Sequence, residues 1–240
     1  MMPAGPRRSP LIAVHGFLGQ ASDWDSVGLQ THFSLDKPDL WSLSASSLDA
    51  AGQELSQMSL PQTKSLLVGY SLGGRIALHA ALAQPEKYRA LVVVSTHPGL
   101  KSESERHSRR EADEVWAKRF ESDENWETLM SAWNRQAVFN ASAPRSLDPR
   151  GPALNRSKLA AALRHWSLGN QADLRPALMR LPLPVLWICG GLDQKFTALA
   201  KDLTGSETQR LCIVETAGHR VPWDEPEIFT RLVRDFEESL

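Results

Sequence analysis

Five short apolar runs recur along the chain with helical patterns between them, and this alternation restricts the possible folds more than any other feature. The runs are rich in valine, isoleucine and leucine and cover residues 11–16, 65–71, 90–96, 184–191 and 210–218. Continuous apolar runs of this length are typical of strands that are buried on both faces of a parallel sheet. The stretches between them, such as GRIALHAALAQPEKY and the closing PEIFTRLVRDFEESL, have the period of amphipathic helices. The sequence therefore predicts an α/β fold with a mostly parallel twisted sheet flanked by helices.

Residues 100–180 interrupt this alternation. They contain no strand-like run, are rich in arginine, and include helical patterns at 103–121 and 157–169. We expect a single domain over 1–240, with its core formed by 1–99 and 181–240 and with 100–180 inserted as a helical cap. Such an insertion would lie over the carboxyl edge of the sheet, where open α/β sheets bind their ligands.

The pentapeptide Gly69-Tyr70-Ser71-Leu72-Gly73 follows a predicted strand and opens a predicted helix. In that context, G-x-S-x-G predicts a nucleophile elbow of the α/β-hydrolase fold. A serine hydroxyl is a weak nucleophile or base unless an imidazole, oriented by a carboxylate, activates it. The fold orders these groups as serine, aspartate, histidine, and Asp193 and His219 follow the last two predicted strands in that order. Ser71, Asp193 and His219 are the predicted catalytic triad.

Two backbone N–H groups are expected to form an oxyanion hole beside the serine. In this fold, one belongs to the residue after the nucleophile, here Leu72, and the other to the loop after an earlier strand. The segment VHGFLG supplies that loop, and its N–H is that of Phe17. We expect His15 to fix the loop by hydrogen bonds and to take no part in the chemistry.

Arg75 follows Ser71 by one helical turn, so both side chains lie on one helix face. A guanidinium beside the nucleophile would not help the site to bind a neutral ester. It favours a substrate that bears a carboxylate, since arginine binds carboxylates through two parallel hydrogen bonds and stays charged. A surface arginine paired with an acidic residue of the insertion is the alternative.

The chain resembles the 2-succinyl-6-hydroxy-2,4-cyclohexadiene-1-carboxylate synthases of menaquinone biosynthesis (the MenH family). The similarity runs through HGFLG, VGYSLGGR, HPGL with the arginine-bearing helix after it, SLGNQADLRPAL, CGGLDQKFTALA and AGH. It implies a lyase of the α/β-hydrolase fold that eliminates pyruvate from 2-succinyl-5-enolpyruvyl-6-hydroxy-3-cyclohexene-1-carboxylate. The triad would act as a general base, with no metal or organic cofactor. By position, Tyr70, Arg75, Arg109 and Trp133 match residues of the substrate pocket.

The chain departs from that family in two places. The loop at 38–46, PDLWSLSAS, replaces the loop that family members usually write as DLPGHG, and it is expected to shorten one wall of the site. A further substrate-binding arginine of the insertion has three candidates here, Arg145, Arg150 and Arg156. We interpret His97-Pro98-Gly99 as a turn at which the chain leaves the sheet.

Charge and hydropathy restrict the partners. The net charge is −1 and no run of like charge occurs, so neither nucleic acid nor a membrane surface is an expected partner. No segment approaches the ~20 apolar residues of a membrane span, and we expect a cytoplasmic protein with a small anionic substrate. The two cysteines, Cys189 and Cys212, lie in predicted strands and are expected to be core thiols.

Two other functions stay open at this point. One is a carboxylesterase-type serine hydrolase acting on small carboxylate-bearing esters, because this fold supports many chemistries. The other is a non-catalytic ligand-binding protein, which a complete triad disfavours. Hydrolysis of short p-nitrophenyl esters would indicate the hydrolase, and release of pyruvate would indicate the lyase.

Overall fold

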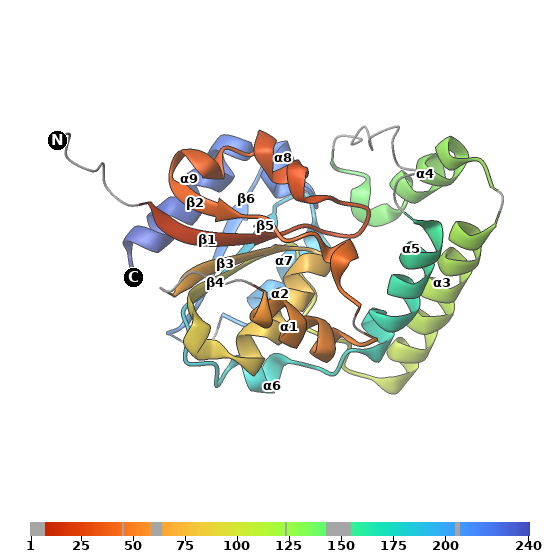
Figure 1. Cartoon of the computed structure of the whole chain (residues 1–240), viewed down its shortest axis with the longest axis horizontal. Coiled ribbons are helices and arrows are strands. Elements are labelled where there is room, and N and C mark those ends of the chain that lie inside the picture. The colour runs from red at the N-terminus through yellow and green to blue at the C-terminus, as the bar shows by residue number, and fades with distance from the viewer. Residues whose placement is uncertain (1–7, 45, 59–63, 123, 143–154, 205–206) are drawn as a thin grey trace.

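A parallel sheet of six strands forms the centre of the chain (Figure 1). The computed structural model describes residues 8–44, 46–58, 64–122, 124–142, 155–204 and 207–240. The strand order is β2-β1-β3-β4-β5-β6, and every neighbouring pair is parallel. The strands are β1 (Ser9–Val14), β2 (Phe33–Asp36), β3 (Ser65–Tyr70), β4 (Tyr88–Val94), β5 (Val185–Gly190) and β6 (Gln209–Val214). The predicted α/β class with a parallel sheet is confirmed.

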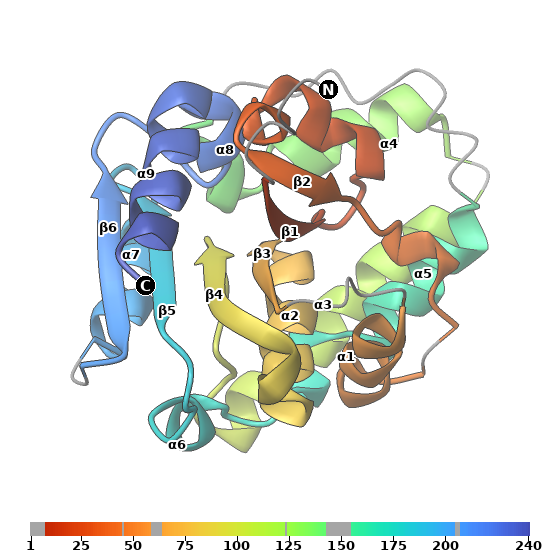
Figure 2. The ribbon, with the colours of Figure 1, turned by 60° about the vertical axis from the view of Figure 1, so that its left-hand side comes forward.

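Strand side chains alternate between two apolar clusters, one on each face of the sheet. Leu67, Val93 and Trp187 belong to the cluster that includes α1 (Leu48–Gln57), α2 (Leu72–Ala83) and α7 (Gln194–Lys201). The residues between them, such as Val92 and Ile188, belong to the cluster on the opposite face, with α8 (Val221–Asp224) and α9 (Pro226–Glu238). Figure 2 shows α8 and α9 on one side of the sheet and α1 and α2 on the other. Because both faces are covered, the central strands β3, β4 and β5 are buried along almost their whole length, as the sequence indicated.

Three helices between β4 and β5 form a separate group beside the sheet (Figure 1). They are α3 (Glu103–Glu121), α4 (Trp126–Asn134) and α5 (Arg156–His165). A third apolar cluster, built on Phe120, Leu129 and Leu159, holds them together. Arg164 of α5 adds ion pairs to Glu114 and Glu121 of α3. The short α6 (Arg175–Leu178) follows this group, and its Leu178 packs in the α1–α2 cluster of the sheet.

Short 3₁₀ helices complete the described elements, at Ala21–Ser26, Leu29–Thr31, Leu40–Ser42, Pro85–Lys87, Ala137–Phe139 and Leu168–Asn170. Cys189 and Cys212 are both free thiols. Within the described part of the chain, every helix is too short or too polar to cross a membrane.

Candidate active site

Ser71 lies in a strained turn between β3 and α2. Its φ of 53° is in the left-handed region, which is uncommon for a residue other than glycine. The turn is held because the Ser71 N–H donates to the Val94 carbonyl, at 2.9 Å, and Arg75 N–H donates back to the Ser71 carbonyl. Gly73 allows it to pack tightly, since a Cβ at that position would lie 2.2 Å from the His15 carbonyl oxygen. This sharp turn carries the hydroxyl to the carboxyl edge of the sheet.

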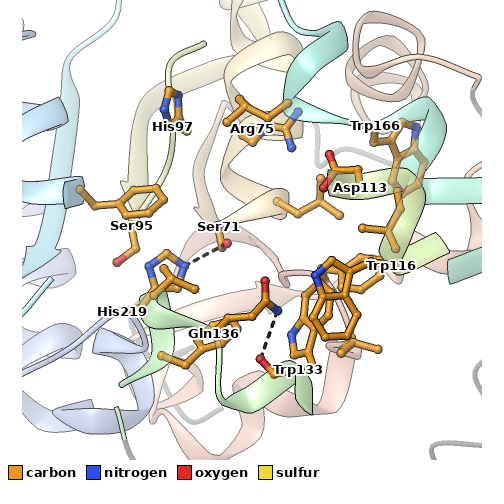
Figure 3. A pocket seen from close by; sticks show the side chains of 18 of the residues that line it. Ser71, Arg75, Ser95, His97, Asp113, Trp116, Trp133, Gln136, Trp166 and His219 are labelled. Atoms are coloured by element: carbon orange, nitrogen blue, oxygen red, sulfur yellow. Dashed lines mark hydrogen bonds between the residues drawn. The ribbon is translucent and has the colours of Figure 1, made fainter. Parts of the chain in front are cut away.

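Ser71, His219 and Asp193 form one chain of hydrogen bonds, and Figure 3 shows the bond between Ser71 and His219. The Ser71 hydroxyl donates to His219 Nε2 at 3.2 Å, and His219 Nδ1–H donates to Asp193 Oδ2 at 2.7 Å. His219 and Asp193 are buried, and the Phe196 ring packs edge-on against the imidazole, with 4.7 Å between ring centres. Asp193 also caps α7 by accepting from the Phe196 N–H. The imidazole is therefore oriented to accept the serine proton.

The loop after β1 brings a second N–H group towards Ser71. Phe17 and Leu72 both line the same cavity as Ser71, and neither backbone N–H donates a hydrogen bond within the described part of the chain. His15 fixes the loop as expected: its Nδ1–H donates to the Gly16 carbonyl at 2.9 Å, and its Nε2 accepts from the Leu40 N–H at 3.1 Å. Two unused donors in such a place suit an oxyanion.

A cavity of about 400 Å³ separates this edge of the sheet from the helices α3 to α5. Each of the residues expected at the site reaches its wall, except Asp193, which lies behind His219; they are Phe17, Tyr70, Ser71, Leu72, Arg75, Arg109, Trp133 and His219. The wall is aromatic on the helical side, where Trp133 packs against Phe17 with 4.9 Å between ring centres. The cavity therefore joins residues of the sheet region to residues of the inserted helices.

Arg75 is buried, with 7% of its surface exposed, and lines the cavity. Its Nε–H donates to Gln171 Oε1 at 2.6 Å, whereas its Nη2 has no hydrogen-bond partner among the described residues. Burial, and then the charge of Arg109, lowers the pKa of Arg75 to about 9, so the side chain is still a cation at neutral pH. An unsatisfied buried donor of this kind suits a ligand that supplies an anion.

Arg109 lies on α3, and its Nε–H donates to both carboxylate oxygens of Asp113 at 2.9 Å. Asp113 is buried and also accepts from the Ser167 hydroxyl at 2.7 Å. The carboxylate therefore fixes the Arg109 side chain, and both residues line the cavity from α3.

Sequence reasoning missed further cavity residues, among them the titratable His97 and Lys195. His97 was interpreted only as part of a turn, but it is buried, and its Nδ1 accepts from the Gly99 N–H, which leaves the proton on Nε2. Burial, followed by the charges of Lys195 and Arg75, lowers the pKa of His97 to about 3. Lys195 follows Asp193 by two residues, and burial together with the charge of Arg109 lowers its pKa. Their positions just beyond strands β4 and β5 were the signal that could have identified them.

The structure bears on one of the three further candidate arginines and on the loop at 38–46. Arg156 lies away from the cavity and donates to the carbonyl oxygens of Ser122 and Glu124, at 2.7 and 2.8 Å. Arg145 and Arg150 lie outside the described residues. No described residue of the 38–46 loop lines the cavity; instead, Trp41 packs edge-on against Phe17.

The described residues contain no group of three or more His, Cys, Asp or Glu side chains that could hold a metal ion.

Comparisons with known proteins agree with this architecture. The model of the alpha/beta hydrolase family matches residues 11–232. The 2-succinyl-6-hydroxy-2,4-cyclohexadiene-1-carboxylate synthase of Enterobacter sp. (strain 638) is 36% identical over 228 residues, covering 90% of this chain and 86% of the relative. That of Salmonella typhimurium is 34% identical over 238 residues, covering 94% and 92%.

Solved structures show the same fold. MenH from S. aureus superimposes with a TM-score of 0.87 at 22% sequence identity, covering 99% of this chain and 97% of that one. A thermophilic esterase from Thermogutta terrifontis superimposes with a TM-score of 0.69 at 20% identity, covering 97% and 90%.

Proposed function

The chain belongs to the α/β hydrolase family and, within it, to the 2-succinyl-6-hydroxy-2,4-cyclohexadiene-1-carboxylate synthases, and on this premise we propose how its cavity acts. It is a carbon–oxygen lyase of menaquinone biosynthesis that eliminates pyruvate from 2-succinyl-5-enolpyruvyl-6-hydroxy-3-cyclohexene-1-carboxylate. The observation that supports this most is a serine–histidine–aspartate relay whose serine and histidine share one cavity wall with Arg75 and Arg109.

The names of substrate and product define the bonds that change. C2, the ring carbon that carries the succinyl group, loses a proton and a C2=C3 double bond forms. The C3=C4 double bond moves to C4=C5, and the bond from C5 to the enolpyruvate oxygen breaks. Enolpyruvate takes up a proton and becomes pyruvate. The reaction therefore requires a base, a proton donor and stabilisation of negative charge on the succinyl carbonyl, and none of these requires a metal or an organic cofactor.

Ser71 is the proposed base. His219 Nε2 takes the hydroxyl proton, and the serine oxygen then takes the proton from the ring carbon. Asp193 holds the imidazole in the required tautomer and stabilises the imidazolium that forms. The proton on His219 is then available to the departing enolpyruvate, so the protons balance over the turnover.

The substrate carries three carboxylates, and the proposed cations of the cavity are Arg75 and Arg109. Their charges would hold the trianion while the N–H groups of Phe17 and Leu72 stabilise the enolate-like oxygen. Tyr70 and Trp133 would form apolar walls that exclude water. In this proposal, residues 100–180 act as a cap over the site of a single-domain protein, and the reaction takes place in the cytoplasm.

The test is pyruvate release, measured through NADH consumption by added lactate dehydrogenase. The purified chain should release pyruvate from the enolpyruvyl compound, and Ser71→Ala, Asp193→Asn and His219→Ala should each lower kcat/KM by roughly 10³ or more. Because the three groups act as one unit, Ser71→Ala/His219→Ala should be no worse than either single variant. Unchanged thermal unfolding of the variants would show that the losses are chemical.

Two results would contradict this proposal. One is a double variant whose loss equals the product of the single losses, because independent groups do not form a relay. The other is a chain that hydrolyses short p-nitrophenyl esters but releases no pyruvate, which would identify a serine hydrolase.

A further inference from the structure

Arg75 is held in place by an amide rather than by a carboxylate. Its Nε–H donates to Gln171 Oε1 at 2.6 Å, and among the described residues no Asp or Glu oxygen pairs with its guanidinium. Two arginines of the inserted helices are different. Arg109 is paired with Asp113, and Arg164 is paired with Glu114 and Glu121. A carboxylate partner would orient Arg75 equally well, but it would also offset the positive charge of the guanidinium. The neutral amide of Gln171 orients the side chain without adding a negative charge.

The orientation of the Gln171 amide is itself fixed. Its Nε2–H donates to the His97 carbonyl oxygen at 3.2 Å, so Oε1 must face Arg75. Only 1% of the Gln171 surface is exposed. The residue lies between the 3₁₀ helix Leu168–Asn170 and α6, on the segment that returns from the inserted helices to the sheet. Gln171 does not line the cavity, so it contacts Arg75 from behind.

This arrangement leaves Arg75 without a direct carboxylate partner among the described residues, because Asp113, the nearby carboxylate, pairs with Arg109. One hydrogen bond fixes the side chain through Nε, while the buried Nη2 keeps no partner among the described residues and the guanidinium borders the cavity. A glutamate at position 171 would form a buried ion pair with Arg75 and weaken its attraction for a substrate carboxylate. We propose that Gln171 is a positioning residue, which orients Arg75 towards the cavity without adding a negative charge that would compete with a substrate carboxylate. This inference rests on the proposed function, in which Arg75 binds such a group.

The variant that separates orientation from charge is Gln171→Glu, because it keeps the oxygen that Arg75 contacts and adds a negative charge. Binding of succinate serves as the probe, followed through the fluorescence of Trp116 and Trp133, which line the cavity. We expect Gln171→Glu to weaken succinate binding by about tenfold or more, since the arginine now has an internal anion. Gln171→Met, which removes the contact but adds no charge, should weaken it by a smaller factor.

Gln209 offers a matched control. It is also buried, accepts from Trp187 Nε1 at 2.8 Å through Oε1, and donates to the Leu178 carbonyl at 3.1 Å through Nε2. It starts β6, so it lies at the opposite end of the strand from the site. Gln209→Glu and Gln209→Met should leave succinate binding unchanged, and thermal unfolding of all four variants shows which of them are folded.

A double-mutant cycle distinguishes positioning from general support. In the Arg75→Ala background, measured at succinate concentrations raised to saturation, the substitutions at Gln171 should have no further effect. If Gln171→Glu does not fold, Gln171→Met completes the same cycle. Equal losses in both backgrounds, parent-like binding by Gln171→Glu, or a parent chain that binds no succinate would overturn the inference. Binding requires no turnover, so a chain that binds succinate as expected but releases no pyruvate contradicts only the proposed function.

Discussion

Substitution of Arg75 tests the proposed recognition of the substrate carboxylate separately from the proposed chemistry of the triad. Arg75→Ala should lower kcat/KM for the tricarboxylate by roughly 10² or more, because a charged hydrogen bond worth about 3 kcal/mol is lost from a desolvated site. Arg75→Lys should restore only part of this, since an ammonium cannot form two parallel hydrogen bonds. Steady-state kinetics on the enolpyruvyl substrate measure both effects.

The control for Arg75 is a small neutral ester. Any slow hydrolysis of such an ester should change little in Arg75→Ala, because the arginine lies one helical turn from Ser71 and makes no contact with His219 or Asp193. Equal losses on the ester and on the anion would mean that Arg75 supports the structure of the turn.

The three residues of the proposed triad could be located from the sequence, whereas the partner of Arg75 could not. Ser71, Asp193 and His219 each follow a buried strand, and parallel strands bring their carboxyl ends to one edge. Gln171 follows no strand, so the sequence gives no such signal for its contact. The bond from Arg75 to Gln171 joins residues 96 positions apart, and it depends on how the inserted helices return to the sheet.

At the level of elements, α2 and the end of β1 approach each other more closely than any side chain allows. A Cβ on Gly73 would lie 2.2 Å from the His15 carbonyl and 2.5 Å from the Val14 carbonyl, and both are backbone atoms. Gly73→Ala must therefore displace the end of β1 together with Phe17. We expect a loss of about 2 kcal/mol in unfolding free energy by urea titration, with kcat lowered by about tenfold or more.

Gly28→Ala is the control for that substitution. Gly28 has a φ of 93°, which strains alanine, but a Cβ there would meet only Thr230 Oγ1, at 3.8 Å. This variant should lose about 1 kcal/mol of stability and keep the parent kcat. If Gly73→Ala also keeps the parent kcat, the β1 loop does not position the oxyanion hole.

Elements with a long regular pattern could be located from the sequence. The helical pattern at 103–121 coincides with α3, and the five apolar runs coincide with strands to within a few residues. Strand β2 was missed, because it has four residues and its burial alternates with exposed polar positions. As an edge strand it pairs only with β1, so it needs no apolar run.

Acid stability is a property of the whole molecule, and His97 should limit it. Burial holds the pKa of His97 at about 3. In the unfolded chain the imidazole takes up a proton below about pH 6.5, but the folded chain does not, so folding free energy is lost as the pH falls from there towards the folded pKa. By about pH 5 the loss from this residue amounts to about 2 kcal/mol.

His97→Asn should remove most of that loss. An asparagine side chain can accept from the Gly99 N–H as the imidazole does, in an Asx turn. Urea unfolding at about pH 7 and about pH 5 should therefore show a smaller difference between the two conditions for His97→Asn than for the parent. His32→Asn, at an exposed histidine, should leave the difference as it is in the parent. A His97→Asn variant with the parent's acid sensitivity would exclude this residue as the cause.

The inserted helices occupy one continuous stretch of the chain, between β4 and β5, whereas Ser71, Arg75, Asp193 and His219 all lie outside it. Recombination between related genes could therefore exchange these helices in one event and leave the proposed triad in place. Gln171 belongs to the exchanged stretch, but Arg75 does not. If Gln171 has the proposed role, a donor segment with glutamate at that position would offset the charge of the recipient's Arg75, and the new chain would bind an anionic substrate more weakly.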